Sequence, residues 1–273
     1  MPDRYAVVGN PVAHSKSPLI HAEFARQTRQ DLSYVALDSQ PDQFEAVVAR
    51  FRADGGRGMN VTLPFKHRAY ALAHSRTPRA DQALSVNTFS FFPERTAGDN
   101  TDGIGLVRDI TENLGSTLRA RRILLLGAGG AAYGACGPLL DVGPASLVVA
   151  NRTTDKAVAL CEHFRRVHER GRLISATAYA DLAEHFDIVI NATSAGLDDA
   201  MPPLPGGVFA PHALAYDMVY GKATPFLEFA RREGARAVDG TGMLVEQAAE
   251  SFHVWRGVRP DTAPVIALLR RGP

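Results

Sequence analysis

The stretch RRILLLGAGGAA, at residues 121–132, decides the fold of this chain of 273 residues. Its isoleucine and leucines predict a buried strand, its glycines a tight turn, and the small residues after them the start of a helix. Gly127, Gly129 and Ala132 have the G-x-G-x-x-A spacing of a dinucleotide-binding unit. Gly127 permits the turn, Gly129 lets the backbone approach a pyrophosphate, and Ala132 allows the helix to pack closely on the strand. The N-terminus of that helix then presents N–H groups and positive dipole charge to the phosphates.

The end of the next strand, LVVA, indicates which dinucleotide is bound. A carboxylate there would bond the ribose hydroxyls of NAD and repel a 2′-phosphate. This chain has Asn151, Arg152 and Thr153 instead, with Lys156 one turn later. A guanidinium fork, a hydroxyl and a second positive charge suit a phosphate, so NADP is predicted. The alternative is an ordinary helix N-terminus, capped by Thr153 or Thr154, with its basic residues in solvent.

Apolar strand runs alternate with helical segments on both sides of this unit, as in α/β proteins. The length suits two domains, with a boundary expected near the glycines at residues 103–105. Strands are predicted at Tyr5–Val8, Tyr34–Leu37, Met59–Thr62, Val86–Phe91, Arg122–Leu126, Leu147–Ala150, Ile188–Asn191, Leu214–Val219 and Ala235–Val238. Helices are predicted at Leu19–Gln30, Phe44–Ala53, Leu106–Asn113 and after Gly242, and a Pro- and Gly-rich surface loop at Asp198–Pro211.

Composition excludes several classes of function. Lys and Arg total 30 against 29 Asp and Glu, so the basic excess typical of nucleic-acid binders is missing. No apolar run approaches the roughly 20 residues of a membrane span, and the N-terminus does not resemble a signal peptide. Cys136 and Cys161 lie in helical segments without metal-ligand spacing. We therefore expect a soluble, cytoplasmic protein with buried thiols, no metal, and neither nucleic acid nor membrane as a partner.

Three polar clusters flank strand ends in the first third of the chain. In GNPVAHSKSP (residues 9–18), Ser15 and Ser17 could grip a carboxylate, although Ser17 could instead cap a helix that begins with Pro18. NVTLPFK (residues 60–66) places a lysine at a strand-to-helix turn. VNT (residues 86–88) is followed by the acid-rich GDNTDG, which is interpreted as a loop without a metal-ligand set.

Nine motifs, taken together and in register, closely resemble the shikimate dehydrogenase family over nearly the whole chain. They are GNPVAHSKSP (9–18), NVTLPFK (60–66), VNT (86–88), GDNTDGIG (98–105), GAGGA (127–131), NRT (151–153), NATSAG (191–196), YDMVY (216–220) and DGTGMLVEQAA (239–249). The resemblance implies an N-terminal α/β substrate domain with a mixed sheet and a Rossmann-type, doubly wound NADP domain. The substrate domain would comprise residues 1–103 and 241–273, to which the C-terminal helices return, and the NADP domain residues 104–240.

The resemblance also implies an oxidoreductase of aromatic amino-acid (chorismate) biosynthesis. It would reversibly reduce the small molecule 3-dehydroshikimate to shikimate with NADPH, and a homodimer is a further expectation. The implied substrate contacts are Ser15, Ser17, Asn60, Thr62, Lys66, Asn87, Asp102, Tyr220 and Gln247. The implied NADP contacts are Gly127, Ala128, Gly129, Gly130, Ala131, Asn151, Arg152, Thr153, Lys156, Thr193, Met218 and Gly242.

Lys66 and Asp102 would be the catalytic pair. Hydride arriving at a ketone places negative charge on oxygen, and an ammonium at that oxygen stabilises the charge and can supply the proton. A carboxylate beside the amine would orient it and hold its charge, at some cost to its acidity.

The chain departs from the family pattern at Tyr133, where an arginine that could contact the cofactor is common, and at the ALSV that precedes Asn87. Two sister activities remain as alternatives: oxidation of quinate as well as shikimate, often with NAD, and use of an aminated substrate analogue. A non-catalytic ligand-binding paralogue is a third. That last alternative predicts loss of Lys66 or Asp102, and both are present.

Overall fold

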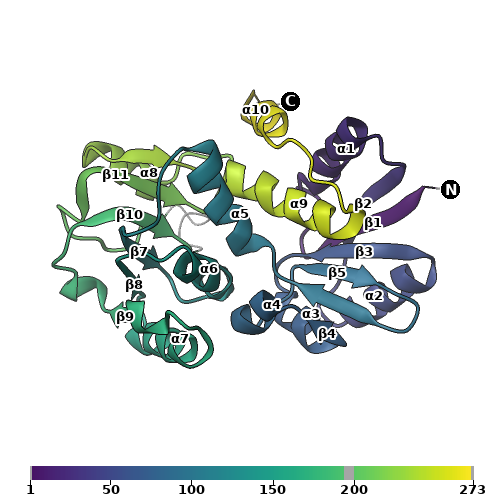
Figure 1. Ribbon diagram of the computed structural model, residues 1–273, viewed down its shortest axis with the longest axis horizontal. Helices are drawn as coiled ribbons and strands as arrows, with labels where there is room; N and C mark the ends of the chain where they lie inside the picture. The colour runs from purple at the N-terminus through teal and green to yellow at the C-terminus, as the bar shows by residue number, and fades with distance from the viewer. Residues whose placement is uncertain (1, 194–199, 272–273) are drawn as a thin grey trace. The chain divides into compact units, whose positions relative to one another are not determined.

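The computed structural model describes residues 2–193 and 200–271, and the chain divides into two compact units (Figure 1). Unit 1 comprises Met1–Gly105 with Val245–Pro273, and unit 2 comprises Leu106–Leu244. Within the described residues each unit has its own six-stranded sheet. The predicted two-domain α/β class is confirmed.

The sheet of unit 1 is mixed, with the strand order β2-β1-β3-β5-β6-β4. Strand β1 runs parallel to β2 and β3, whereas β5 runs antiparallel to β3 and β6. The strands are β1 Asp3–Gly9, β2 Leu32–Asp38, β3 Gly56–Val61, β4 Ser75–Arg76, β5 Thr88–Phe91 and β6 Thr96–Asp99. The helices are α1 Ser17–Thr28, α2 Phe44–Ala53, α3 Lys66–Leu72, α4 Pro78–Ala83, α5 Asp102–Arg108, α9 Thr241–Arg256 and α10 Ala263–Arg271, of which α5 and α9 each cross a unit boundary in sequence.

The sheet of unit 2 is parallel, with the order β12-β11-β10-β7-β8-β9. Counted from β7, this is the 3-2-1-4-5-6 order of the doubly wound dinucleotide-binding fold. The strands are β7 Arg122–Leu126, β8 Ser146–Ala150, β9 Ile174–Thr177, β10 Phe186–Asn191, β11 Phe209–Asp217 and β12 Arg236–Val238. The helices are α6 Gly130–Asp141, α7 Thr154–Val167 and α8 Pro225–Arg232, with a π-helical turn η1 at Asp109–Asn113 and short 3₁₀ turns η2 Gly171–Leu173 and η3 Tyr179–Asp181.

Strand register places the ends of four strands of unit 2 side by side. Leu126 pairs with Ala150 on one side and with Asn191 on the other, and Asn191 pairs with Asp217. Because these strands are parallel, the segments that leave them all emerge at one edge of the sheet. This carboxyl edge is where ligands bind in open α/β sheets.

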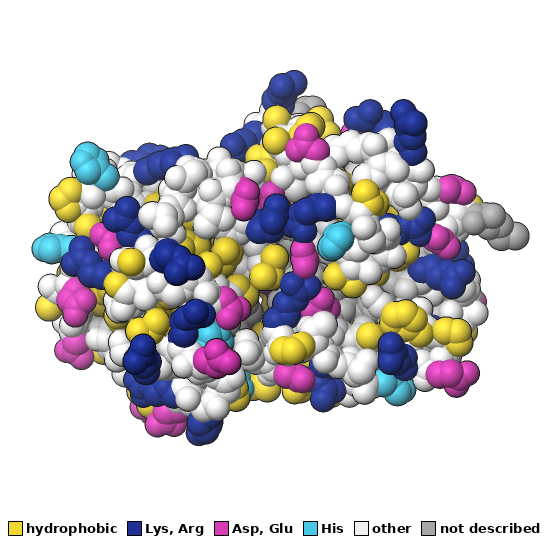
Figure 2. Space-filling model, in the orientation of Figure 1, with side chains coloured by type: hydrophobic (Ala, Val, Ile, Leu, Met, Phe, Trp, Pro, Cys, Tyr) yellow, Lys and Arg dark blue, Asp and Glu magenta, His cyan; other side chains and the backbone are white. Residues whose placement is uncertain are grey.

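Each unit has its own apolar core. In unit 1 it gathers around Phe44, Phe65 and Phe89, and in unit 2 the leucines of β7 lie at 0% exposure between two apolar clusters. Basic and acidic side chains are interspersed on the face of the molecule that Figure 2 shows. No helix in the described residues is long and apolar enough to cross a membrane.

Several sequence predictions needed correction. Gly98 and Asp99, interpreted as the start of an acid-rich loop, lie in strand β6, because Thr96–Asp99 pairs with both β5 and β4. Strands β4 and β9 and helix α4 were not predicted. Strand β11 begins at Phe209, inside the predicted surface loop, and Val208 to Ala210 are buried. Residues 198–199 of that loop, and residues 194–196 of the NATSAG motif, lie outside the described residues.

Candidate active site

The predicted catalytic pair is in contact. Lys66 is the first residue of α3 and Asp102 the first of α5, and Lys66 Nζ lies 2.6 Å from Asp102 Oδ2. The side chains are 24% and 11% exposed, so both are largely shielded but reachable from solvent. A carboxylate at this distance holds the amine in a fixed position.

Asn87, which immediately precedes β5, binds the second carboxylate oxygen of Asp102. Its Nδ2 donates to Asp102 Oδ1 at 2.8 Å and to Thr101 Oγ1 at 2.9 Å. Its Oδ1 accepts from the backbone N–H of Thr101 at 2.9 Å, which defines the orientation of the amide because a backbone N–H can only donate. Asp102 is therefore bonded at both oxygens, by Lys66 and by Asn87.

Gln247 approaches this group from α9. Its Oε1 lies 3.5 Å from Asn87 Nδ2. The helix comes this close because residue 105 is glycine: a Cβ atom there would lie 2.6 Å from the backbone nitrogen of Gln247. Four of the predicted substrate residues, Lys66, Asn87, Asp102 and Gln247, thus meet at one place in unit 1.

Ser15 lies in the loop that leads into α1, and Ser17 is the first residue of that helix. Ser15 Oγ accepts from the backbone N–H of Ser17 at 3.2 Å. The alternative in which Ser17 caps the helix is wrong, because Lys16 occupies the N-cap position and makes no side-chain capping bond. The loop adjoins the NVTLPFK segment, since a Cβ at Gly9 would lie 2.4 Å from Thr62 Cγ2. Ser15 and Thr62 are half-buried, and Ser17 is 8% exposed.

Asn60 is buried, and its amide is bonded to protein groups at both ends. Its Oδ1 accepts from Tyr34 Oη at 2.7 Å, and its Nδ2 lies 3.0 Å from the hydroxyls of both Thr88 and Ser251 and 3.1 Å from the carbonyl of Asn87. At 7% exposure its amide is committed to protein partners on both sides. Tyr34 also interacts with Ser17, and burial raises the pKa of the Tyr34 hydroxyl well above its usual range.

In unit 2 the glycine turn has the geometry that a dinucleotide needs. Gly127 has a φ of +102°, a conformation that L side chains rarely adopt, and its N–H donates to the Ala150 carbonyl at 2.8 Å. A Cβ at Gly129 would meet no atom within 4 Å, so the backbone there faces open space. Gly129 is the N-cap of α6 and supplies no side chain to the first N–H groups of that helix. Ala128, Gly130 and Ala131 complete the loop, which fits a pyrophosphate.

The residues predicted to bind the 2′-phosphate of NADP follow β8. Asn151 Nδ2 donates to the Thr153 carbonyl at 2.9 Å, which closes the turn before α7. Thr153 is the N-cap of α7, but its hydroxyl makes no capping bond, contrary to the capping alternative. Arg152 and Lys156 are exposed, and neither side chain forms a hydrogen bond or ion pair with another described residue. The two positive side chains are thus available at the edge that holds the glycine turn.

A buried carboxylate organises two neighbouring loops at the same edge. Asp217 Oδ2 accepts from Asn191 Nδ2 at 3.2 Å and from Thr224 Oγ1 at 2.6 Å, and its Oδ1 accepts from the N–H of Val219 at 3.0 Å. Asn191 Oδ1 in turn accepts from the Thr193 hydroxyl at 2.7 Å. Burial raises the pKa of Asp217 and the hydrogen bond from Thr224 opposes that rise. The buried Asn191–Asp217 pair therefore fixes Thr193 and the segment that contains Met218 and Tyr220.

Gly242 has a packing role that sequence reasoning missed. A Cβ there would lie within 2.4 Å of both carboxylate oxygens of Asp109, which is fully buried in the π-helical turn η1. Asp109 Oδ2 accepts from Tyr216 Oη at 2.7 Å, and Tyr216 Oη accepts from the N–H of Met243 at 3.3 Å. The glycine is required by this carboxylate whether or not it also touches a cofactor. No short motif marks Asp109, and the same holds for Tyr34 and Ser251.

Tyr133 and the cysteines belong to the core of unit 2. The Tyr133 ring lies 5.7 Å from that of His163 and 6.2 Å from that of Phe164, both in α7, so it packs between α6 and α7. Cys136 and Cys161 are buried and unpaired, as predicted, and burial raises the pKa of Cys161 to about 11. No group of three or more His, Cys, Asp or Glu that could hold a metal ion occurs among the described residues.

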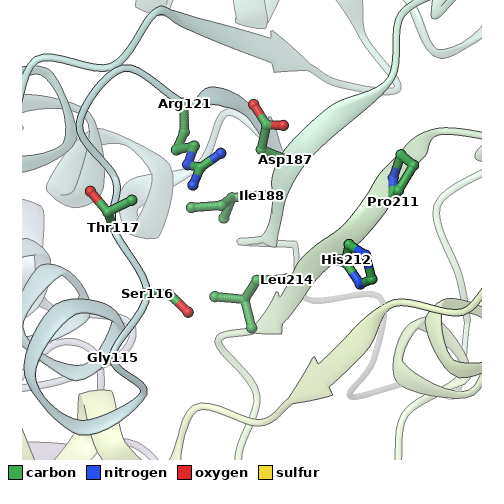
Figure 3. Close-up of a pocket in the computed structure, with 9 residues that line it drawn as sticks. All are labelled: Gly115, Ser116, Thr117, Arg121, Asp187, Ile188, Pro211, His212 and Leu214. Carbon is green, nitrogen blue, oxygen red and sulfur yellow. The ribbon is translucent and has the colours of Figure 1, made fainter.

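A cavity of about 420 Å³ lies elsewhere in unit 2 (Figure 3). It opens at the amino ends of β7, β10 and β11, with Arg121 and Asp187 on one side and His212 on the other. His212 has a φ of 63° within an irregular part of β11. The cavity contains none of the predicted site residues and lies at the edge opposite the glycine turn.

The fold and these two groups of residues define a two-domain, dinucleotide-dependent dehydrogenase. Three family models match the chain: shikimate dehydrogenase substrate binding domain at residues 7–89, shikimate / quinate 5-dehydrogenase at 109–197, and shikimate 5′-dehydrogenase C-terminal domain at 240–270. The chain belongs to the shikimate dehydrogenase family, which confirms the predicted resemblance.

Individual relatives match over the whole length. The shikimate dehydrogenase (NADP(+)) of Methylobacillus flagellatus is 57% identical, over 98% of this chain and 99% of the relative. The crystal structure of an Ael1 enzyme from Pseudomonas putida has a TM-score of 0.93 and 53% identity, covering 98% of each chain. Shikimate 5-dehydrogenase from Thermus thermophilus, solved in complex with NADP(H) and shikimate, has a TM-score of 0.88 and 34% identity, covering 98% of this chain and 99% of that one.

Proposed function

We propose that this chain catalyses the reversible, NADPH-dependent reduction of 3-dehydroshikimate to shikimate. The observation that carries the proposal is the Lys66–Asp102 contact at 2.6 Å, held by Asn87 beside Gln247. These four side chains provide an ammonium, a carboxylate and two amides, which suit a polyhydroxylated ring with one ketone. Family membership and the NADP-linked relatives support the same reaction.

Lys66 is assigned the proton transfer. When bound, NADPH supplies a hydride to the ketone carbon, and the carbonyl oxygen gains negative charge as its double bond opens. The Lys66 ammonium stabilises that charge and gives its proton to the oxygen, forming the hydroxyl of the product. Asp102 holds the amine in place before the transfer, and the amine regains a proton from solvent afterwards. In the oxidative direction, the neutral amine accepts the hydroxyl proton.

Substrate and cofactor contacts are proposed as the resemblance implies. Ser15 and Ser17 bind the carboxylate with Thr62, since their loop adjoins the Thr62 segment. Asn60 and Tyr220 are proposed contacts of the substrate ring, and Tyr220 lies in the segment between β11 and α8. The glycine turn at residues 127–131 would hold the pyrophosphate of NADP, and Asn151, Arg152, Thr153 and Lys156 its 2′-phosphate. Thr193, Met218 and Gly242 would line the remainder of the cofactor site.

The assignment of roles to domains is likewise a proposal. Residues 1–103 with 241–273 would bind substrate, and residues 104–240 would bind NADP. The two buried, unpaired thiols suit a reducing cytoplasm. A homodimer is proposed as well, and light scattering on the purified chain would test it.

The deciding experiment measures initial rates with shikimate or quinate, each paired with NADP or NAD. We expect fast turnover only with shikimate and NADP. Comparable rates with quinate or NAD would move the chain to the dual-specificity sister group. Absence of turnover in every pairing would contradict the proposal and leave the aminated substrate or a ligand-binding role.

A further inference from the structure

A pair of hydroxyls lies directly behind Asn87 in unit 1. Thr88, the first residue of β5, and Ser251, in α9, have their Oγ atoms 2.8 Å apart. Thr88 is 1% exposed and Ser251 0% exposed, so neither can touch a substrate. The two hydroxyls contact Asn60, Asn87 and the backbone of Gln247, which are three of the predicted substrate residues.

The pair has no spare proton. Thr88 Oγ1 lies 2.8 Å from Asn87 Oδ1, and Ser251 Oγ lies 3.0 Å from the carbonyl oxygen of Gln247. Each hydroxyl donates once, and a separation of 2.8 Å between the two oxygens requires a proton between them. Asn87 Oδ1 can only accept, so its 2.8 Å separation from Thr88 Oγ1 requires the Thr88 proton. Thr88 therefore donates to Asn87 and Ser251 donates to Thr88, which joins Asn87 to α9 through the pair.

The acceptor side is just as constrained. Asn60 Nδ2 lies 3.0 Å from both hydroxyl oxygens and, as an amide nitrogen, can only donate to them. Asn87 Oδ1 faces Thr88 and the N–H of Thr101, so Asn87 Nδ2 must face Asp102. The hydroxyl of Thr88 is therefore a second fixed contact on the oxygen side of the amide whose nitrogen holds the catalytic carboxylate.

We infer that Thr88 and Ser251 are positioning residues for the proposed reaction, which hold the Asn87 amide against Asp102 and anchor the Gln247 turn of α9 beside it. The inference rests on the proposed function. Removing the Thr88 hydroxyl takes away one hydrogen bond to Asn87 Oδ1, while Ser251 can still donate to Gln247. Removing the Ser251 hydroxyl leaves the Thr88–Asn87 bond intact. Loss of Thr88 should accordingly have the larger effect.

The test compares Thr88→Val, which replaces the hydroxyl by a methyl of similar size, with Thr88→Ser, which keeps the hydroxyl. For Thr88→Val we expect kcat for shikimate at saturating NADP to fall about tenfold and KM to change less than about threefold, as for loss of one hydrogen bond that aligns the reacting groups. Thr88→Ser should stay within about twofold of the wild type. Thr96→Val, a similarly buried threonine in β6 outside this cluster, controls for the substitution itself.

Ser251→Ala provides a second variant in case Thr88→Val does not fold. We expect its kcat to fall about threefold, and the double variant to lose less than the product of the single losses because the two hydroxyls share one bond. Unchanged kcat in both folded variants would overturn the inference, and so would an equal loss in Thr88→Ser, since packing alone would then be responsible. A wild-type chain that does not turn over shikimate would overturn the proposed function and this inference together.

Discussion

The two units build their sites in different ways. In unit 2 the proposed cofactor site is made of backbone and exposed side chains that follow β7, β8, β10 and β11, whose ends strand register aligns at one edge. In unit 1 the proposed catalytic site is made of side chains from α3, α5, α9 and the segment before β5, joined by hydrogen bonds. One site depends on where strands end, and the other on a buried polar network.

The difference affects how each site responds to mutation. A phosphate gripped by exposed side chains should lose affinity in steps, one side chain at a time. A network whose members hold one another in place should lose turnover sharply when one member goes, because its partners stay buried and unpaired. The predictions below test this contrast, beginning with the largest expected effect.

Replacement of Lys66 should have the largest effect on turnover. In Lys66→Met the proton donor and its charge are lost while most of the unbranched side chain is kept, so kcat for shikimate should fall about 10³-fold. KM for shikimate should rise far less, because several other side chains bind the ring. Steady-state rates over a range of shikimate concentrations measure both constants.

NADPH affinity, followed by nucleotide fluorescence, is the control for Lys66→Met and should match the wild type. A variant that keeps its kcat would remove Lys66 from the mechanism. A variant that loses NADPH binding as well would show that the two sites are not built independently.

Removal of the two exposed cations should act on cofactor choice alone. In the double variant Arg152→Ala/Lys156→Ala, KM for NADP should rise at least about 100-fold, since each charge-assisted contact to a phosphate contributes about 1.5–3 kcal/mol. KM for NAD, which lacks the 2′-phosphate, should change little, and so should kcat with shikimate. The measurement is the ratio of kcat/KM for the two cofactors.

Arg166→Ala is the matched control, since it removes one exposed positive charge from the far end of α7. It should leave the cofactor ratio unchanged. An equal loss with NADP and NAD in the double variant would mean that the cations support the fold of the turn and not the phosphate.

The contrast also explains what the sequence could predict. The glycine turn, the strand before it and the polar residues after β8 are local in sequence, and β7 was predicted with its observed bounds. Helix α2 was likewise predicted residue for residue, because its apolar positions follow one helical face. Such features depend on propensity and spacing within a few residues.

The network of unit 1 could be predicted only in part. The resemblance named Lys66, Asn87, Asp102 and Gln247, and the structure brings them together. Residues alone could not, because Asn60 and Ser251 are 191 positions apart when they bond. Strand β6 was missed for another reason: TAGD as a whole has little strand propensity, and its pairing with β5 and β4 makes it a strand.

The smallest expected effect is on stability, and it comes from His21, one of two buried histidines that lie in different units. His168 of unit 2 contacts Asp141 Oδ1 at 3.1 Å, whereas neither ring nitrogen of His21 in unit 1 has a hydrogen-bond partner among the described residues. His21 stacks on Tyr34, with 4.1 Å between ring centroids, and burial lowers its pKa to about 3. Between pH 3 and its ordinary pKa of 6.5, the unfolded chain therefore binds a proton that the folded chain excludes.

The free energy of unfolding should accordingly fall as the pH falls through this range, by up to about 1.4 kcal/mol per unit and by about 2 kcal/mol from pH 7 to pH 5. His21→Leu should lose that component. Urea unfolding at both pH values can be followed by Trp255, the single tryptophan, whose ring lies 5.5 Å from that of His21. The control is His253→Gln, which replaces an exposed histidine in α9, the helix of Trp255. This variant should keep the pH dependence of the wild type. An identical acid loss in His21→Leu would mean that the acid sensitivity of unit 1 comes from its carboxylates, and that the unpartnered ring is tolerated without a pH-dependent cost.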